Sequence, residues 1–164
     1  MHRIAALSLL LAFAATALPA VADDKIRLQV PIPFVEDHDI DDEIISHCGI
    51  QEDFTRRLTR ELRKVAVAEQ APITDMAGQV LKVEIVDALW AGNWFIEHDQ
   101  TIRVRGTLYR DGEHQAAFNG VIMGRGGSLS SGCYQMKSYF GAMTWHIRRW
   151  LRNPVDGARI GQGG

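Results

Sequence analysis

The stretch from about Val80 to Met123 most constrains the fold, because apolar and polar residues alternate along it for the length of three strands. Every second residue from Ile102 to Leu108 is apolar or glycine, and the alternation resumes after Asp111-Gly112. A period of two residues is typical of a half-buried strand. The sequence therefore predicts an antiparallel meander with one apolar face.

Matching apolar residues across the second turn favours a three-residue loop, Arg110-Asp111-Gly112. This loop, with its bulge and with Gly112 in the left-handed conformation, places Val104 opposite Phe118 on the apolar face. A two-residue loop would mix the two faces, so the three-residue loop is the prediction.

The first turn is predicted at Gly92-Asn93, which places Val83 opposite Ile102. In that register Asp87 and His98 face each other on the apolar side, close to the turn. An unpaired charge is costly there, which marks the pair as a candidate site. A structural pair that caps the core is the alternative.

The N-terminus has the pattern of a secretory signal peptide. A basic start leads into an apolar run, Ile4 to Leu18, and Ala20-Val21-Ala22 precedes Asp23 with the small residues of a cleavage site. The run is too short for a membrane anchor, no other run could span a bilayer, and no cysteine near the cut could carry a lipid. We expect an exported, periplasmic or secreted protein with a signal peptide (1–22), one domain (23–153) and a flexible C-terminal tail (154–164).

Charge argues against nucleic acid as a partner. Without Arg3, 17 of the 18 Lys and Arg residues remain against 20 Asp and Glu, a net charge of −3 in the mature chain. A nucleic-acid-binding domain would carry an excess of positive charge. We expect a protein or another envelope component as the partner.

Two helices flank the meander in the prediction. The first spans about Gly49 to Ala68 and the second about Ser131 to Arg152, each with one apolar stripe. The first also carries a basic stripe (Arg56, Arg60, Arg63), either a solvated face or a contact for anionic lipid or an acidic partner. A strand with apolar residues at Ile26, Leu28, Val30 and Ile32 precedes them.

The acidic run from Glu36 to Glu43 fails as a calcium loop. Asp42 stands where the loop requires glycine, and Cys48 stands where it requires glutamate. A solvated loop is predicted, with a metal site that uses His38 and His47 as the alternative. No motif for a cofactor is present. The Gly-Ser segment from Gly124 to Gly132 is either an anion-binding loop or a connector.

The predicted fold is a single α+β domain in the order β-α-β-β-β-α, with a mostly antiparallel four-stranded sheet and two helices on one face. Both helices then begin at the same end of the sheet. Cys48 and Cys133 lie at those two beginnings, and an oxidising compartment favours a disulfide between them.

The signal peptide, the strand, the helix, the meander with Arg110-Asp111-Gly112, the Gly-rich exit and the terminal helix together resemble small bacterial envelope proteins. These include auxiliary and assembly proteins of outer-membrane systems, many of which carry a lipid-attachment cysteine that this chain lacks. The resemblance is one of architecture and implies no particular site residue.

Two functions are open. In the first, the protein is a non-catalytic binding or assembly module; the candidate contact residues are Trp90, Trp94, Asp87, His98 and Trp145. In the second, it is a cysteine hydrolase of an envelope substrate, with Cys133 as a nucleophile at a helix N-terminus and His98 or His47 as the base. A Cys48–Cys133 disulfide would contradict the second.

Overall fold

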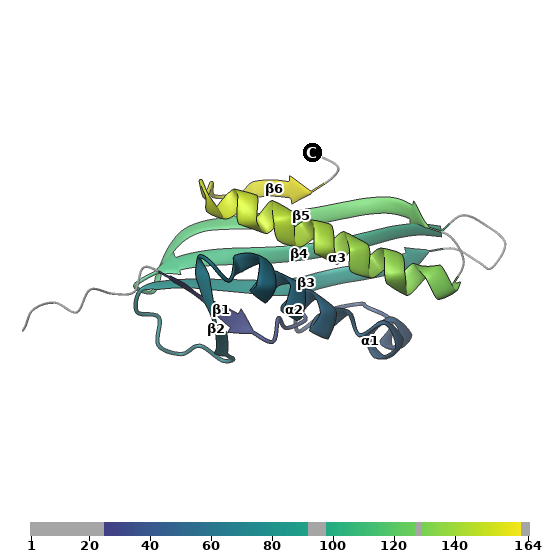
Figure 1. The fold of residues 1–164 in the computed structure, drawn as a ribbon, viewed down its shortest axis with the longest axis horizontal. Coiled ribbons are helices and arrows are strands. Elements are labelled where there is room, and N and C mark those ends of the chain that lie inside the picture. The colour runs from purple at the N-terminus through teal and green to yellow at the C-terminus, as the bar shows by residue number, and fades with distance from the viewer. Residues whose placement is uncertain (1–24, 92–97, 127–128, 162–164) are drawn as a thin grey trace, which may run out of the picture.

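A single sheet with its helices on one face forms the molecule (Figure 1). The computed structural model describes residues 25–91, 98–126 and 129–161. Its strands are β1 (Ile26–Val30), β2 (Ala66–Gln70), β3 (Gln79–Ala91), β4 (His98–Arg110), β5 (Glu113–Gly126) and β6 (Ala158–Gly161). Its helices are α1 (Asp42–Cys48), α2 (Ile50–Leu62) and α3 (Leu129–Leu151).

The sheet has the strand order β2-β1-β3-β4-β5-β6. The three long strands β3, β4 and β5 form the antiparallel meander, while β1 is parallel to both β2 and β3 and β6 is parallel to β5. The α+β class and the single helix-covered face are as predicted. The predicted counts are wrong, because the described residues form six strands and three helices.

The two unpredicted strands are the short edge strands. Helix α2 ends at Leu62 rather than near Ala68, and the chain from Ala66 runs back beside β1, where Ala66 pairs with Ile26. Strand β6 lies within the segment expected to be a tail. Asp156, two residues before β6, fixes the chain against β5, because its Oδ1 lies 2.8 Å from both the His114 Nε2 and the Ala117 amide nitrogen.

The acidic run ends in a helix rather than forming only a loop. Asp41 caps α1, and its Oδ1 accepts a hydrogen bond of 2.8 Å from the Glu43 amide. Gly49 separates α1 from α2 with a φ of 54°, a conformation that glycine adopts without strain. This left-handed residue stops the first helix and turns the chain into the second.

The predicted register across the second turn is wrong by two residues. Val104 pairs with Gly120, and Phe118 pairs with Gly106. The turn has two residues, Asp111 and Gly112, whose φ values of 51° and 81° fit a type I′ hairpin turn. A register shift next to Tyr109 restores the faces that a two-residue loop alone would mix, so the bulge lies in the strands rather than in the predicted three-residue loop.

The predicted register across the first turn is also wrong. Val83 pairs with Gly106, and Ile102 pairs with Ala88. The register shifts between Ile85 and Asp87, so residues beyond this bulge change face. The predicted turn at Gly92-Asn93 lies outside the described residues.

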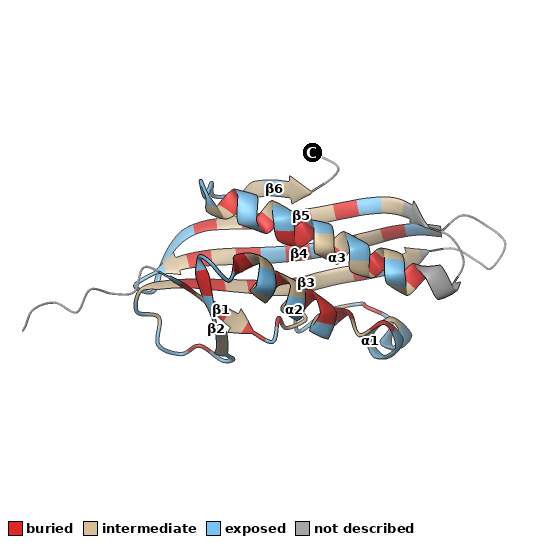
Figure 2. Cartoon of the chain, in the orientation of Figure 1, coloured by how far each residue is buried: buried red, intermediate tan, exposed pale blue. Residues whose placement is uncertain are grey.

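The core lies between the sheet and the helices, on the face that the alternation predicted (Figure 2). Phe118 is fully buried against Trp150, with ring centroids 4.9 Å apart, and Phe54 of α2 meets Phe140 of α3 at 5.0 Å. Although the pairings were wrong, Val83, Val104, Ile102 and Phe118 are all buried. We call the face of the sheet that packs against the helices the covered face, and the opposite face the outer face.

Candidate partner-binding surface

Cys48 and Cys133 form a disulfide with their Cα atoms 5.1 Å apart. The bond joins the last residue of α1 to the N-terminal part of α3, as predicted from the shared end of the two helices. It removes the free thiolate that a hydrolase nucleophile would need. The cysteine-hydrolase hypothesis is therefore wrong for the protein in this state.

Trp90 lies on the covered face, beneath α3, and packs against the core. A Cβ atom placed on Gly132 would come within 2.1 Å of the indole ring, so the ring occupies the space beside this glycine. Only glycine permits such a close approach. Trp90 therefore helps to seat the start of α3 and does not stand out from the hairpin tip.

Asp87 is not opposite His98. The bulge turns it to the outer face, where it pairs with Arg103; the Asp87 Oδ2 and Arg103 Nη1 atoms are 3.7 Å apart. Asp87 and Trp90, predicted to share a site, thus lie on opposite faces of the sheet. Trp94 and the side chain of His98 lie outside the described part of the chain.

The sequence analysis missed an apolar row on the outer face. Leu89 and Met123 flank Thr101, their shared cross-strand neighbour, and are 43% and 51% exposed. Adjacent strands are about 4.8 Å apart, so the two side chains stand roughly 10 Å from each other across β4. Met123 fell on the polar side of the predicted alternation, a sign of this row that the sequence did contain. Leu89 could not be placed there without the bulge.

We call Leu89, Thr101 and Met123 the outer-face patch. Its neighbours are Val121 and the Asp87–Arg103 pair, one row along the strands. Among the described residues, no helix crosses this face; the helices lie on the other side (Figure 1). The patch thus presents two exposed apolar side chains beside one ion pair on the outer face.

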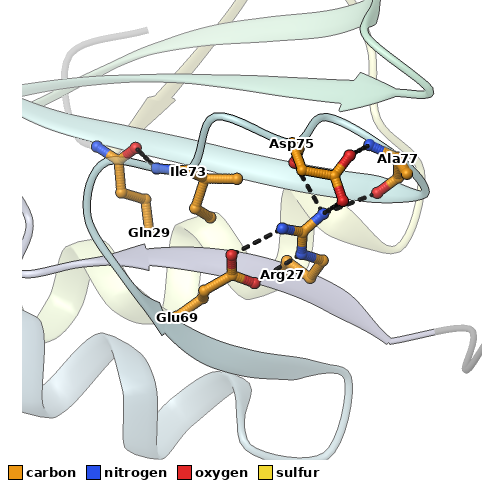
Figure 3. A network of polar contacts seen from close by, with 6 residues as sticks. All are labelled: Arg27, Gln29, Glu69, Ile73, Asp75 and Ala77. Carbon is orange, nitrogen blue, oxygen red and sulfur yellow. Dashed lines mark hydrogen bonds and ion pairs between the residues drawn. The ribbon is translucent and has the colours of Figure 1, made fainter.

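The outer face of β1, in contrast, is covered by the segment between β2 and β3 (Figure 3). Arg27 makes two hydrogen bonds to the Glu69 carboxylate, of 2.6 and 2.7 Å, and donates to the carbonyl oxygens of Asp75 and Ala77 at 2.9 and 3.0 Å. The hydrogen bond to Arg27 lowers the pKa of Glu69 and raises that of Arg27. This network covers the outer face at β1 and leaves it open over β3, β4 and β5.

Trp145 lies on the solvent side of α3 and is 51% exposed, which agrees with its outer placement in the predicted helix. Tyr134, 80% exposed, is eleven residues earlier and thus three turns away on the same side. Arg149 lies over the Trp145 ring at 5.6 Å, and burial together with Arg149 lowers the pKa of His146. The structure does not bring Trp145 together with Asp87, since α3 and the sheet separate them.

The described helices include none that is both long enough and apolar enough to cross a membrane. Nor do the described residues bring together three or more His, Cys, Asp or Glu side chains that could hold a metal ion.

No protein-family model and no curated protein sequence matches the chain. Solved structures do resemble it. A minor lipoprotein from Acinetobacter baumannii is 12% identical over 78% of this chain and 91% of that one, with a TM-score of 0.49. The lipoprotein GNA1162 from Neisseria meningitidis is 11% identical over 79% and 99%, with a TM-score of 0.44. A PelC dodecamer from Paraburkholderia phytofirmans is 14% identical over 73% and 83%, with a TM-score of 0.42.

Proposed function

We propose that this is an exported envelope protein that binds or assembles a protein partner and catalyses no reaction. The observation that carries the proposal is the outer-face patch, where Leu89 and Met123 present apolar side chains on an uncovered sheet. Exposing such residues to water costs solvation free energy, at about 25 cal/mol per Å² of apolar surface. Covering them with a partner recovers that free energy.

Export is supported by the apolar run and by Ala20-Val21-Ala22, and we propose cleavage after Ala22. The Cys48–Cys133 bond supports the same compartment, because disulfides persist where the surroundings are oxidising. The mature domain would then begin at Asp23. Intact mass of the exported protein tests both points: cleavage removes 22 residues, and the bond accounts for two missing hydrogens.

The proposed contact extends from the patch towards the hairpin tip. Asp87 and Arg103 supply a polar edge that can orient the partner, and Trp94 and His98 are the nearest further candidates along the chain. Trp90 is not part of the proposed contact, because its ring packs beside Gly132. A Trp90→Ala change would therefore disturb the fold rather than report on binding.

Site-specific photo-crosslinking in the exporting cells tests the proposal. A photoreactive amino acid at Thr101, in the centre of the patch, should give one adduct of defined mass. The same amino acid at Ser138, exposed on α3, should give none. Changing Leu89→Ser and Met123→Ser together should remove the Thr101 adduct.

The matched control is Tyr134→Ser with Trp145→Ser, which alters an equal number of exposed apolar side chains on α3. This pair should leave the Thr101 adduct unchanged. The proposed surface would be contradicted if the Thr101 adduct survived the Leu89 and Met123 changes. It would also be contradicted if an adduct formed from position 138 and none formed from position 101.

A further inference from the structure

A second surface, at the other end of the molecule, carries an excess of positive charge. A hollow of about 500 Å³ opens where the last turns of α2 and α3 meet the first residue of β1. We call its cationic lining the basic pole; it consists of Arg60, Arg63, Lys64, Arg148 and Arg152. All five side chains are exposed.

The charge of the basic pole is largely uncompensated. Arg148 bonds Glu61 at 2.8 Å, and Glu61 is the only acidic residue in the lining. Within the described part of the chain, the other four cations form no ion pair. The C-termini of α2 and α3 end here and contribute roughly −0.5 elementary charge each. Against five cations, Glu61 and both helix ends leave a net charge of about +3.

Apolar side chains lie among these cations. Val65 is 46% exposed, and Leu151 and Ile26 line the same hollow. Leu151 and Ile26 also line a neighbouring hollow of about 350 Å³, which adds a further cation, Arg110. Cations around the exposed Val65 match a layer of anionic headgroups over acyl chains better than they match a soluble anion.

The basic pole also lies close in sequence to the N-terminal apolar run. Ile26 begins β1 and lines the hollow, and Leu18, at the end of the apolar run, is eight residues earlier. Eight residues span at most about 29 Å when fully extended. During export, before cleavage after Ala22, an apolar run in the bilayer would therefore bring this end of the domain next to the lipid surface.

We infer that the basic pole is a docking surface for an anionic phospholipid membrane. The contact joins lipid phosphates to Arg60, Arg63, Lys64 and Arg152, and Val65 lies at the headgroup boundary. The inference does not depend on the partner contact proposed above, since the outer-face patch lies elsewhere on the molecule. It gives a chain without a lipid-attachment cysteine near its expected cleavage site a reversible hold on the membrane.

Vesicle flotation of the protein purified after export tests the inference. The protein should float with phosphatidylcholine vesicles that contain roughly 30% phosphatidylglycerol at about 0.1 M salt, and binding should fall steeply at about 0.5 M salt. It should not float with pure phosphatidylcholine vesicles. Changing Arg60→Gln, Arg63→Gln and Lys64→Gln together should lower the partition coefficient at least about tenfold.

The matched control removes the same charge elsewhere, with Arg105→Gln, Lys137→Gln and Arg159→Gln, and should bind as the unchanged protein does. Thermal melts of both triple variants check that each is folded. Equal flotation of the two variants, or flotation with neutral vesicles, would overturn the inference. Tight binding of inorganic phosphate without flotation would also overturn it and would identify a soluble anion as the ligand. No flotation at all would overturn it too and would favour an acidic protein as the partner of the basic pole.

Discussion

The phenyl ring of Phe118 lies over the Cα atom of Gly106, its cross-strand partner; a Cβ atom added at Gly106 would come within 2.3 Å of the ring. The ring is fully buried and also contacts Trp150 of α3. Gly106 therefore provides the space into which the largest side chain of β5 packs. The pair links the centre of the sheet to the last turns of α3.

This relationship predicts the cost of two substitutions. Phe118→Ala should lower the free energy of unfolding by about 3–5 kcal/mol, because it leaves a cavity in the core. Gly106→Ala should lower it by about 1–3 kcal/mol, because the added methyl group displaces the ring. Denaturant melts measure both. Thr107→Ala, a neighbouring change on the outer face, should cost less than about 0.5 kcal/mol, and a similarly small cost for Phe118→Ala would contradict this packing.

The apolar face of this sheet was predictable, but its pairings were not. Alternation assigned Val83, Val104 and Phe118 to the core face without reference to a partner strand. Register depends instead on bulges, and neither the one near Val86 nor the one near Gln115 has a distinctive sequence. The bulge between Ile85 and Asp87 alone moved Asp87 and Leu89 to the outer face, and with them the candidate site.

The edge strands were missed for a different reason. Ala66–Gln70 follows directly on a helical pattern, and its five residues carry too short an alternation to compete with that pattern. Only β1 as a neighbour makes it a strand. The disulfide, by contrast, followed from topology, because a crossover helix requires both helices to start at one end of the sheet.

The disulfide should contribute strongly to stability. Its cysteines are 85 residues apart, and the chain-entropy model gives on the order of 4–5 kcal/mol for a loop of that length. Changing Cys48→Ala and Cys133→Ala together should therefore lower the denaturant midpoint markedly. Alkylation of the unfolded, unreduced protein should label neither thiol, and labelling of both would mean that the bond does not form in the cell.

Gln100 is fully buried on the covered face, and neither its amide nitrogen nor its oxygen has a hydrogen-bond partner in the described structure. A buried polar group without a partner costs about 1–3 kcal/mol. Gln100→Leu, of similar volume, should raise the free energy of unfolding by that amount. A loss of stability in the melt would show instead that the amide bonds a water molecule or ligand.

Docking of β6 should depend on pH through Asp156. The hydrogen bonds from His114 and from the Ala117 amide hold the pKa of this carboxyl below its ordinary value of 3.8. The carboxylate therefore stabilises the docked strand fully above about pH 3.8, and this stabilisation is lost as the pH falls through the lowered pKa.

Hydrogen exchange of the β6 amides measures this effect. Protection of the β6 amides that bond β5 should decrease below pH 3.8 while β4 amides stay protected. Asp156→Asn should show the decrease already at neutral pH. Unchanged protection in that variant would mean that the strand ladder alone holds β6.

The length of the meander strands sets the distance between the basic pole and the outer-face patch. Gln79 lines the hollow beside the basic pole, and Leu89 of the outer-face patch is ten residues further along the same strand. At about 3.3 Å per residue, the two points are roughly 33 Å apart. Hydrogen bonds to β4 along this length make the sheet stiff. If the protein docks on a membrane by its basic pole, a partner bound to the outer-face patch would be held about 30 Å above the lipid. Lengthening or shortening the strands by pairs of residues would raise or lower that partner in steps.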